Sequence, residues 1–152
     1  MNMPVKEQID AIELATFAPY QISVLADMIA RRVAAITKSH AGINLSQWRV
    51  LAAVADQAGC TANEVTAVTP MDKGIVSRAV KALLEMGLLV RNASQEDGRL
   101  AHLYLTPKGR RAYALLATKI REIDAQMSRN VTKKNWKQLS VLLNSMINGF
   151  SG

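Results

Sequence analysis

The chain has 152 residues, of which 49% are hydrophobic, 5% are aromatic and one is cysteine. This length fits one domain, or a small domain with dimerising extensions, and an apolar set rich in Ala, Leu, Val, Ile and Met favours helices over a sheet sandwich. A single cysteine excludes an intrachain disulfide framework and a multi-cysteine zinc site, whereas the net charge of +7 favours a polyanionic partner.

The N-terminal stretch MNMPVKEQIDAIE carries acidic residues where a signal peptide would have its apolar segment. No apolar run approaches the roughly 18 residues that a membrane span needs. We therefore expect a cytoplasmic protein with no membrane contact. The positive excess lies mainly in the C-terminal part of the chain and not around residues 71–87, because residues 107–152 hold nine basic and two acidic residues.

Apolar residues at helical spacing predict a first helix over residues 20–38, with Gly42 as its stop. A second helix over 47–58 is expected to start after a cap at Ser46 and to end at Gly59. The predicted buried residues of these two helices are Ile22, Leu25, Ile29, Val33 and Ile36 in the first, and Trp48, Leu51, Ala52 and Ala55 in the second.

Capping signals delimit two further helices. Thr61 and Glu64 form a predicted capping box at the start of the segment ANEVTAV. Asp72 is the expected cap of a fourth helix, which Gly87 ends. Met71 and Val76 are placed to form a hydrophobic staple at the start of this fourth helix.

The pattern then changes to that of a β-hairpin. Leu89-Val90 and residues 101–105 are predicted as two short strands around the polar tip NASQEDGR. Pro107 marks the start of a long helix that runs to about residue 128, and a last helix is expected over 133–149. Heptad-like apolar stripes on these two helices indicate helix-on-helix burial between subunits, with packing inside one chain as the alternative.

The fourth helix has two different faces. Ile75, Ala79, Leu83 and Leu84 recur at a spacing that buries one side. The opposite side carries small and basic residues, namely Lys73, Gly74, Ser77, Arg78 and Lys81. Three short helices followed by a hairpin predict a winged helix-turn-helix over residues 46–106. In such a lobe this stripe would face the major groove, with Ser77 and Arg78 at base edges, Lys73 and Lys81 at phosphates, and Gly74 allowing close approach. The alternative is a solvated amphipathic helix.

Arg99 lies near the tip of the predicted hairpin, where it can enter the minor groove of A·T-rich DNA. Asp97, two residues earlier, can accept hydrogen bonds from that arginine or from loop amides and so orient it. A turn loop also carries one acid and one base by chance.

The runs MDKGIVSRAVKALLEMGLLVR and EDGRLAHLYLTPKGR resemble the MarR family of bacterial transcription regulators, in the recognition helix, the D-x-R wing motif and the L-T-x-K-G lead-in to the next helix. The resemblance covers about residues 20–148. It implies an obligate homodimer in which the first, fifth and sixth helices interlock. It also implies binding to a pseudo-palindromic double-stranded DNA operator, usually as a repressor that a small ligand releases.

The expected fold is therefore mainly α, with a two-stranded wing. We expect an N-terminal arm and first dimerisation helix over 1–45, a DNA-binding lobe over 46–106 and C-terminal dimerisation helices over 107–152. One feature departs from the family, in which acidic residues often start the last helix. Here Lys133, Lys134 and Lys137 stand there, and the region either frays, meets an acidic partner such as the negative N-terminal segment, or contacts the DNA backbone.

The stretches FAPYQISVLADMIARR and SQWRVLA resemble members that respond to aromatic carboxylates and phenolics. On that resemblance the effector pocket takes Ser23, His40, Trp48 and Arg49, with Trp48 as an apolar wall and Arg49 or His40 binding the carboxylate or phenol. The alternatives are that Trp48 belongs to the core, that Arg49 forms a salt bridge, and that His40 lies in a loop.

Cys60 raises a redox alternative, because some family members sense hydroperoxides through a cysteine near the start of the first helix. Cys60 has no closely flanking basic residue to lower its pKa, so we expect a small buried core residue. The histidines and the cysteine stand in unrelated contexts, so we expect no catalytic site, metal site or cofactor. The remaining alternative is a winged helix that contacts protein or RNA.

Overall fold

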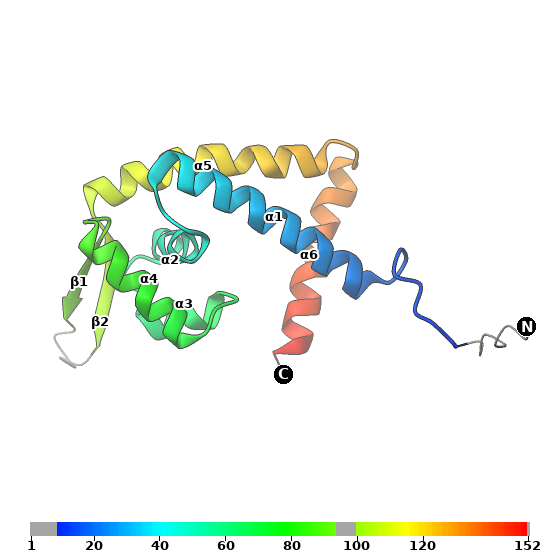
Figure 1. The fold of residues 1–152 in the computed structure, drawn as a ribbon, viewed down its shortest axis with the longest axis horizontal. Helices are drawn as coiled ribbons and strands as arrows, with labels where there is room; N and C mark the ends of the chain where they lie inside the picture. Colours follow the sequence, from blue (N-terminus) through cyan, green and yellow to red (C-terminus); the bar gives the residue numbers. More distant parts are fainter. Residues whose placement is uncertain (1–8, 94–99, 152) are drawn as a thin grey trace, which may run out of the picture.

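The computed structural model describes residues 9–93 and 100–151, which form a mainly helical chain with one two-stranded sheet (Figure 1). A lobe of short helices carries the hairpin, and α1 and α5 pack side by side and connect this lobe to α6. The elements in chain order are α1 (Ala18–Ala41), α2 (Leu45–Asp56), α3 (Ala62–Val68), α4 (Lys73–Glu85), β1 (Leu89–Ala93), β2 (Ala101–Leu105), α5 (Pro107–Ser128) and α6 (Lys133–Phe150).

The helix ends follow local capping chemistry. Thr61 and Glu64 form the predicted capping box of α3, and the Asp72 carboxylate accepts the Ile75 amide at 2.8 Å at the start of α4. Gly42 and Gly87 adopt left-handed conformations after α1 and α4, as predicted, with φ of 63° and 70°. One predicted cap was wrong. Asn44, not Ser46, caps α2, because its side chain accepts the Gln47 amide while the Gln47 side chain accepts the Asn44 amide.

The wing is longer than the sequence predicted. β1 pairs with β2 in antiparallel register from Leu89↔Leu105 to Ala93↔Ala101, so β1 extends beyond Val90 into the stretch that was expected to form the tip. An isolated bridge between Cys60 and Leu103 adds the segment before α3 to the same sheet. This bridge fixes the wing to the helix-turn-helix.

The lobe has one apolar core to which helices, strands and α5 all contribute. The buried faces of α2 and α4 are each turned by about one residue from the predicted stripes. Trp48, Ala52, Ala55, Ile75 and Leu84 are half-buried at the edge of the core rather than at its centre. The fully buried members are Ile43, Val50, Leu51, Val54, Val65, Val76, Val80, Leu83, Leu103 and Leu116.

The terminal helices are incompletely covered. α6 contains no buried residue, and its Val141 and Ile147 side chains are 62% and 60% exposed. On α1, Ile22 and Leu25, predicted as buried, are also exposed. Packing within one chain therefore covers only part of the apolar surface of these helices, because Val33 is buried and Trp136 and Leu143 are half-buried while other apolar side chains stay exposed. In the part of the chain that the structure covers, no helix combines the length and apolarity needed to cross a membrane.

Candidate nucleic-acid interface

The exposed face of α4 carries the basic and small residues of the predicted stripe. Lys73, Gly74, Ser77, Arg78 and Lys81 are all exposed, whereas the opposite side of the helix is fixed in the lobe core. The structure therefore brings these five positions together on one solvent-facing surface. Such a surface offers hydrogen-bond donors to base edges and positive charge to phosphates.

Arg78 lies beside the start of α2. Its side chain lines a cleft of about 340 Å³ together with Asn44, Ser46, Gln47 and Ile75. A Cβ atom added to Gly74 would lie 3.4 Å from Arg78 Nη1, which is ordinary van der Waals contact. The protein would therefore accommodate a methyl group at position 74, and the fold itself does not require glycine there.

The sequence L-T-x-K-G forms a set of contacts that connects the end of α4 to the start of α5. Thr106 caps α5 by accepting the Gly109 amide at 2.9 Å, and its hydroxyl donates to the Gly87 carbonyl at 2.5 Å. Lys108 Nζ donates to the Met86 carbonyl at 2.9 Å. Gly109 packs directly against the backbone of Leu88. We call these contacts the α4–α5 junction. In the sequence this motif was recognisable as a family feature, but its physical role was not.

The wing contributes one basic residue that the sequence analysis did not select. Arg91 on β1 is exposed and lines a cleft of about 160 Å³ with Asn63 at the start of α3. A basic residue directly after the predicted strand Leu89-Val90 was the available signal. Asp97 and Arg99, the predicted wing residues, lie outside the described residues.

The four predicted effector residues do not form one group in a single protomer. Ser23 and His40 lie 17 positions apart on α1, a separation of about 25 Å along the helix axis. His40 is exposed, and its Nδ1 lies 3.0 Å from the Ile36 carbonyl oxygen. Trp48 stacks on Tyr113 of α5, with ring centroids 5.6 Å apart and planes 10° from parallel. Arg49, beside it on α2, is half-buried.

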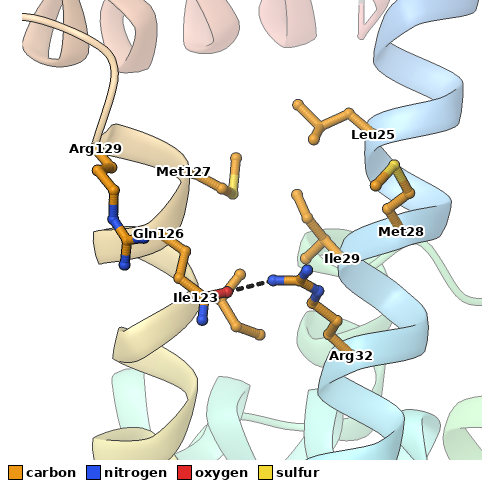
Figure 2. Close-up of a pocket in the computed structure, with 8 residues that line it drawn as sticks. All are labelled: Leu25, Met28, Ile29, Arg32, Ile123, Gln126, Met127 and Arg129. Atoms are coloured by element: carbon orange, nitrogen blue, oxygen red, sulfur yellow. Dashed lines mark hydrogen bonds between the residues drawn. The ribbon is translucent and has the colours of Figure 1, made fainter.

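Two cavities between the long helices were not predicted. The first, about 350 Å³, lies between α1 and α5, where Ile29 faces Ile123 and the Arg32 guanidinium donates to Gln126 Oε1 (Figure 2). The second, about 680 Å³, lies between α1, α5 and α6 and includes Trp136 and Leu143 in its lining. Both consist largely of the apolar stripes that the sequence analysis assigned to helix packing.

Cys60 is a buried core residue between Gly59 and α3, as expected. Desolvation by burial, followed by the negative charge of Glu64, raises the pKa of the Cys60 thiol above its ordinary value. A raised pKa lowers the thiolate population and disfavours a redox role. The described residues also contain no group of three or more His, Cys, Asp or Glu side chains placed to hold a metal ion.

Comparison with known proteins finds similarity to one family. A model of the MarR family matches residues 41–100. The HTH-type transcriptional regulator BilQ of Clostridium symbiosum is 29% identical over 105 residues, covering 69% of this chain and 73% of BilQ. A MarR/EmrR family transcriptional regulator from Acinetobacter sp. ADP1 superposes with a TM-score of 0.83 at 25% identity, covering 92% of this chain and 99% of that one. CouR from Rhodococcus jostii RHA1, solved bound to p-coumaroyl-CoA, shares the fold with a TM-score of 0.80 at 21% identity, covering 90% of this chain and 95% of CouR.

Proposed function

Because the chain belongs to the MarR family of winged helix-turn-helix transcriptional regulators, we propose that it is a repressor that binds a pseudo-palindromic operator as a homodimer. In this proposal, binding of a small aromatic acid or phenol releases the protein from the operator. Proteins of this family regulate transcription by binding DNA, so the chain is not an enzyme. The observation that carries the DNA-binding proposal is the exposed face of α4, which presents small and basic residues. The opposite face of the same helix is buried in the lobe core.

In this proposal α4 is the recognition helix. Ser77 and Arg78 contact base edges or nearby phosphates, and Lys73 and Lys81 contact phosphates. The position of the helix supports this reading over a merely solvated amphipathic helix. The preceding helix α3 is fixed by its capping box, and the cap at Asp72 sets where α4 begins. Gly74 lets the sugar-phosphate backbone approach the first turn of α4.

The wing makes the second contact. We assign Arg99 to the adjacent minor groove, oriented by Asp97, and place Arg91 near a phosphate of the same strand. Arg91 supports this assignment because it is exposed on the hairpin and lies beside the start of α3. A narrow A·T-rich minor groove has an enhanced negative potential that attracts arginine.

The homodimer forms through α1, α5 and α6. Its support is the apolar surface that a single protomer leaves open, including Leu142 and Met146 of α6 and Met28 of α1, together with the cavity between the three helices. Contiguous exposed apolar surface of this kind marks an interaction site. In the resulting two-fold assembly, two recognition helices about 34 Å apart meet successive major grooves.

The effector site lies where α2 meets α5. Trp48 and Tyr113 supply aromatic surface, and Arg49, the half-buried residue that follows Trp48 on α2, binds a carboxylate in this proposal. The complex of CouR with p-coumaroyl-CoA supports an aromatic acyl or acid effector. His40 stays a candidate at the end of α1, whereas Ser23, near the other end of α1, would have to reach this region from the partner subunit.

A binding selection tests the DNA proposal. Random-sequence duplexes are enriched on the full-length protein, and the recovered site is titrated by fluorescence anisotropy against a scrambled duplex and an RNA duplex of the same sequence. We expect two inverted half-sites separated by one helical turn, and much weaker binding to both competitors. Equal affinity for scrambled DNA, or preference for RNA, would overturn the proposal.

A ligand titration tests the effector proposal. Aromatic acids are first screened by thermal shift, because a ligand that binds the folded state raises the melting temperature. A hit should weaken operator binding some 5–150-fold, the range of typical coupling energies. Arg49→Ala should blunt this response and leave ligand-free operator binding nearly unchanged. An undiminished response in Arg49→Ala removes Arg49 from the pocket, and failure of every aromatic acid rejects the effector class.

A further inference from the structure

An acidic and apolar arm precedes α1. Every residue from 9 to 17 is exposed, and the Ile9 and Ile12 side chains are 78% and 61% exposed. The arm forms hydrogen bonds within itself and with the first turn of α1, such as the one from the Thr16 hydroxyl to the Glu13 carbonyl at 3.3 Å. Figure 1 shows the arm running from α1 away from the rest of the chain. Among the described residues, nothing in the same protomer covers it.

The first turn of α6 has the complementary charge. Lys133, Lys134 and Lys137 are exposed, and no acidic residue stands in that turn to offset the positive end of the helix dipole. The Thr132 side chain caps the helix by accepting the Asn135 amide at 3.2 Å, so the lysines are carried on a formed turn. This turn favours an anionic partner.

The charges of the arm and of α6 do not pair within one chain. The structure forms an ion pair between Arg31 and Asp27 at 2.7 Å, but across residues 9–93 and 100–151 it contains none that involves Asp10, Glu13 or the lysines of α6. Both surfaces are therefore available to a second copy of the chain.

Lys133 and Lys134 precede Lys137 by four and three residues, so the three lysines lie on neighbouring stripes of α6. Lys137 also lines the cavity between α1, α5 and α6 together with Asp124. Lys133 and Lys134 are the first two residues of the helix, and Val141 is exposed two turns further along it. The α6 start thus presents positive charge near an exposed apolar side chain, and the arm presents acids beside isoleucines.

We propose that each arm crosses to the second copy in the homodimer and sets Asp10 and Glu13 against Lys133 and Lys134 of the partner subunit. Ile9 and Ile12 then cover exposed apolar surface of the partner's α6. This inference rests on the proposed homodimer and goes beyond it by assigning the arm and the lysine-rich turn to each other. Because a two-fold interface is self-complementary, the contact forms twice in each dimer.

A subunit-mixing experiment with two full-length variants tests this assignment. The arm variant carries Asp10→Lys and Glu13→Lys, and the helix variant carries Lys133→Glu and Lys134→Glu. Each homodimer then sets like charges against each other and should dissociate roughly tenfold more readily, or more, at low salt. The heterodimer of the two variants restores opposite charges at both contacts, because each reversed arm lies on a reversed helix and each native arm on a native one.

Equimolar mixing, with one variant tagged, is followed by native mass spectrometry. We expect a heterodimer fraction well above the one half that random exchange gives, and loss of the preference in about 1 M salt, where exposed charges are screened within roughly 3 Å. A matched control mixes the arm variant with Arg111→Glu. This control should exchange at random, because Arg111 is exposed near the start of α5, beside the lobe and away from the start of α6.

Random exchange of the arm and helix variants overturns the crossed arm. If the wild-type chain is a dimer that binds its operator, this result leaves the proposed function intact. An arm folded back onto its own α6 also gives random exchange. Equal preference with the Arg111→Glu control overturns the assignment to Lys133 and Lys134. A wild-type monomer by light scattering overturns the proposed homodimer and this inference with it.

Discussion

Gly109→Ala tests whether the α4–α5 junction is rigid. A Cβ atom at position 109 would lie 2.0 Å from the Leu88 carbonyl oxygen and 2.9 Å from its carbonyl carbon. Neither contact can be relieved by rotating a side chain, because both involve backbone. The Leu88 carbonyl also accepts the Thr106 amide at 3.1 Å, so moving it away weakens a second contact of the junction.

Two opposing terms set the magnitude. Overpacking a well-packed site typically costs about 1–3 kcal/mol. The cost at position 109 lies at the upper end of this range, because the added Cβ atom would meet the backbone of Leu88. Replacing a helical glycine by alanine returns about 0.5–1 kcal/mol. We therefore expect the free energy of unfolding to fall by about 2 kcal/mol, which corresponds to a drop in melting temperature of roughly 4–8 °C for a chain of this size.

Thermal denaturation at fixed protein concentration measures this effect, with Gly149→Ala in α6 as the matched control. A Cβ at position 149 meets nothing within 4 Å, so the same substitution should leave stability unchanged or raise it. Operator affinity of Gly109→Ala, measured well below its melting temperature, should also fall, because α5 must shift relative to α4. A melting temperature equal to that of the wild type would refute the rigid junction.

The remaining predictions concern the lobe. Arg78→Ala should cost about 1–3 kcal/mol on the selected operator, and equal losses on operator and random DNA would reduce Arg78 to a phosphate contact. Lys81→Ala should weaken binding to all sequences and reduce the salt slope of log K by about one unit, and an unchanged slope would remove Lys81 from the interface. Gly74→Ala should leave the melting temperature unchanged or higher yet weaken operator binding, which paired melting and anisotropy measurements would separate. Cys60 should react with maleimide at pH 8 far more slowly in the folded protein than in denaturant, because burial raises its pKa; rapid labelling of the native protein would contradict this.

Signals that act within a few residues were readable in the sequence. The capping box at Thr61 and Glu64 and the glycine stop at Gly87 depend on contacts three to five residues apart, so the pattern alone identifies them. The bounds of α5 follow in the same way from Pro107, with Thr106 as its cap. The basic face of α4 was also identified correctly as exposed.

Features set by distant segments were not readable. In α4, apolar residues occupy positions 75, 76, 79, 80, 83 and 84. This band is so wide that the sequence fits two different positions for the centre of the buried face. Packing against α2 and α3 selects Val76 and Val80 over Ile75 and Leu84. The bridge from Cys60 to Leu103 has the same origin, because it joins segments more than 40 residues apart. The separation of Ser23 and His40 along α1 was also not readable, because family resemblance gives no distance along a helix.

The two ends of α5 belong to different parts of the molecule, and this division supplies a physical route for the proposed effector response. Tyr113 and Leu116 pack with the lobe core, whereas Ile123 and Met127 line the cavities shared with α1. A helix of 22 residues is about 33 Å long, so a tilt of about five degrees at one end displaces the other by about 3 Å. The α4–α5 junction passes that displacement to the recognition helix, which must keep its spacing from the second recognition helix. A ligand at the Trp48–Tyr113 stack therefore releases DNA only to the extent that it binds the tilted arrangement more tightly than the DNA-bound one.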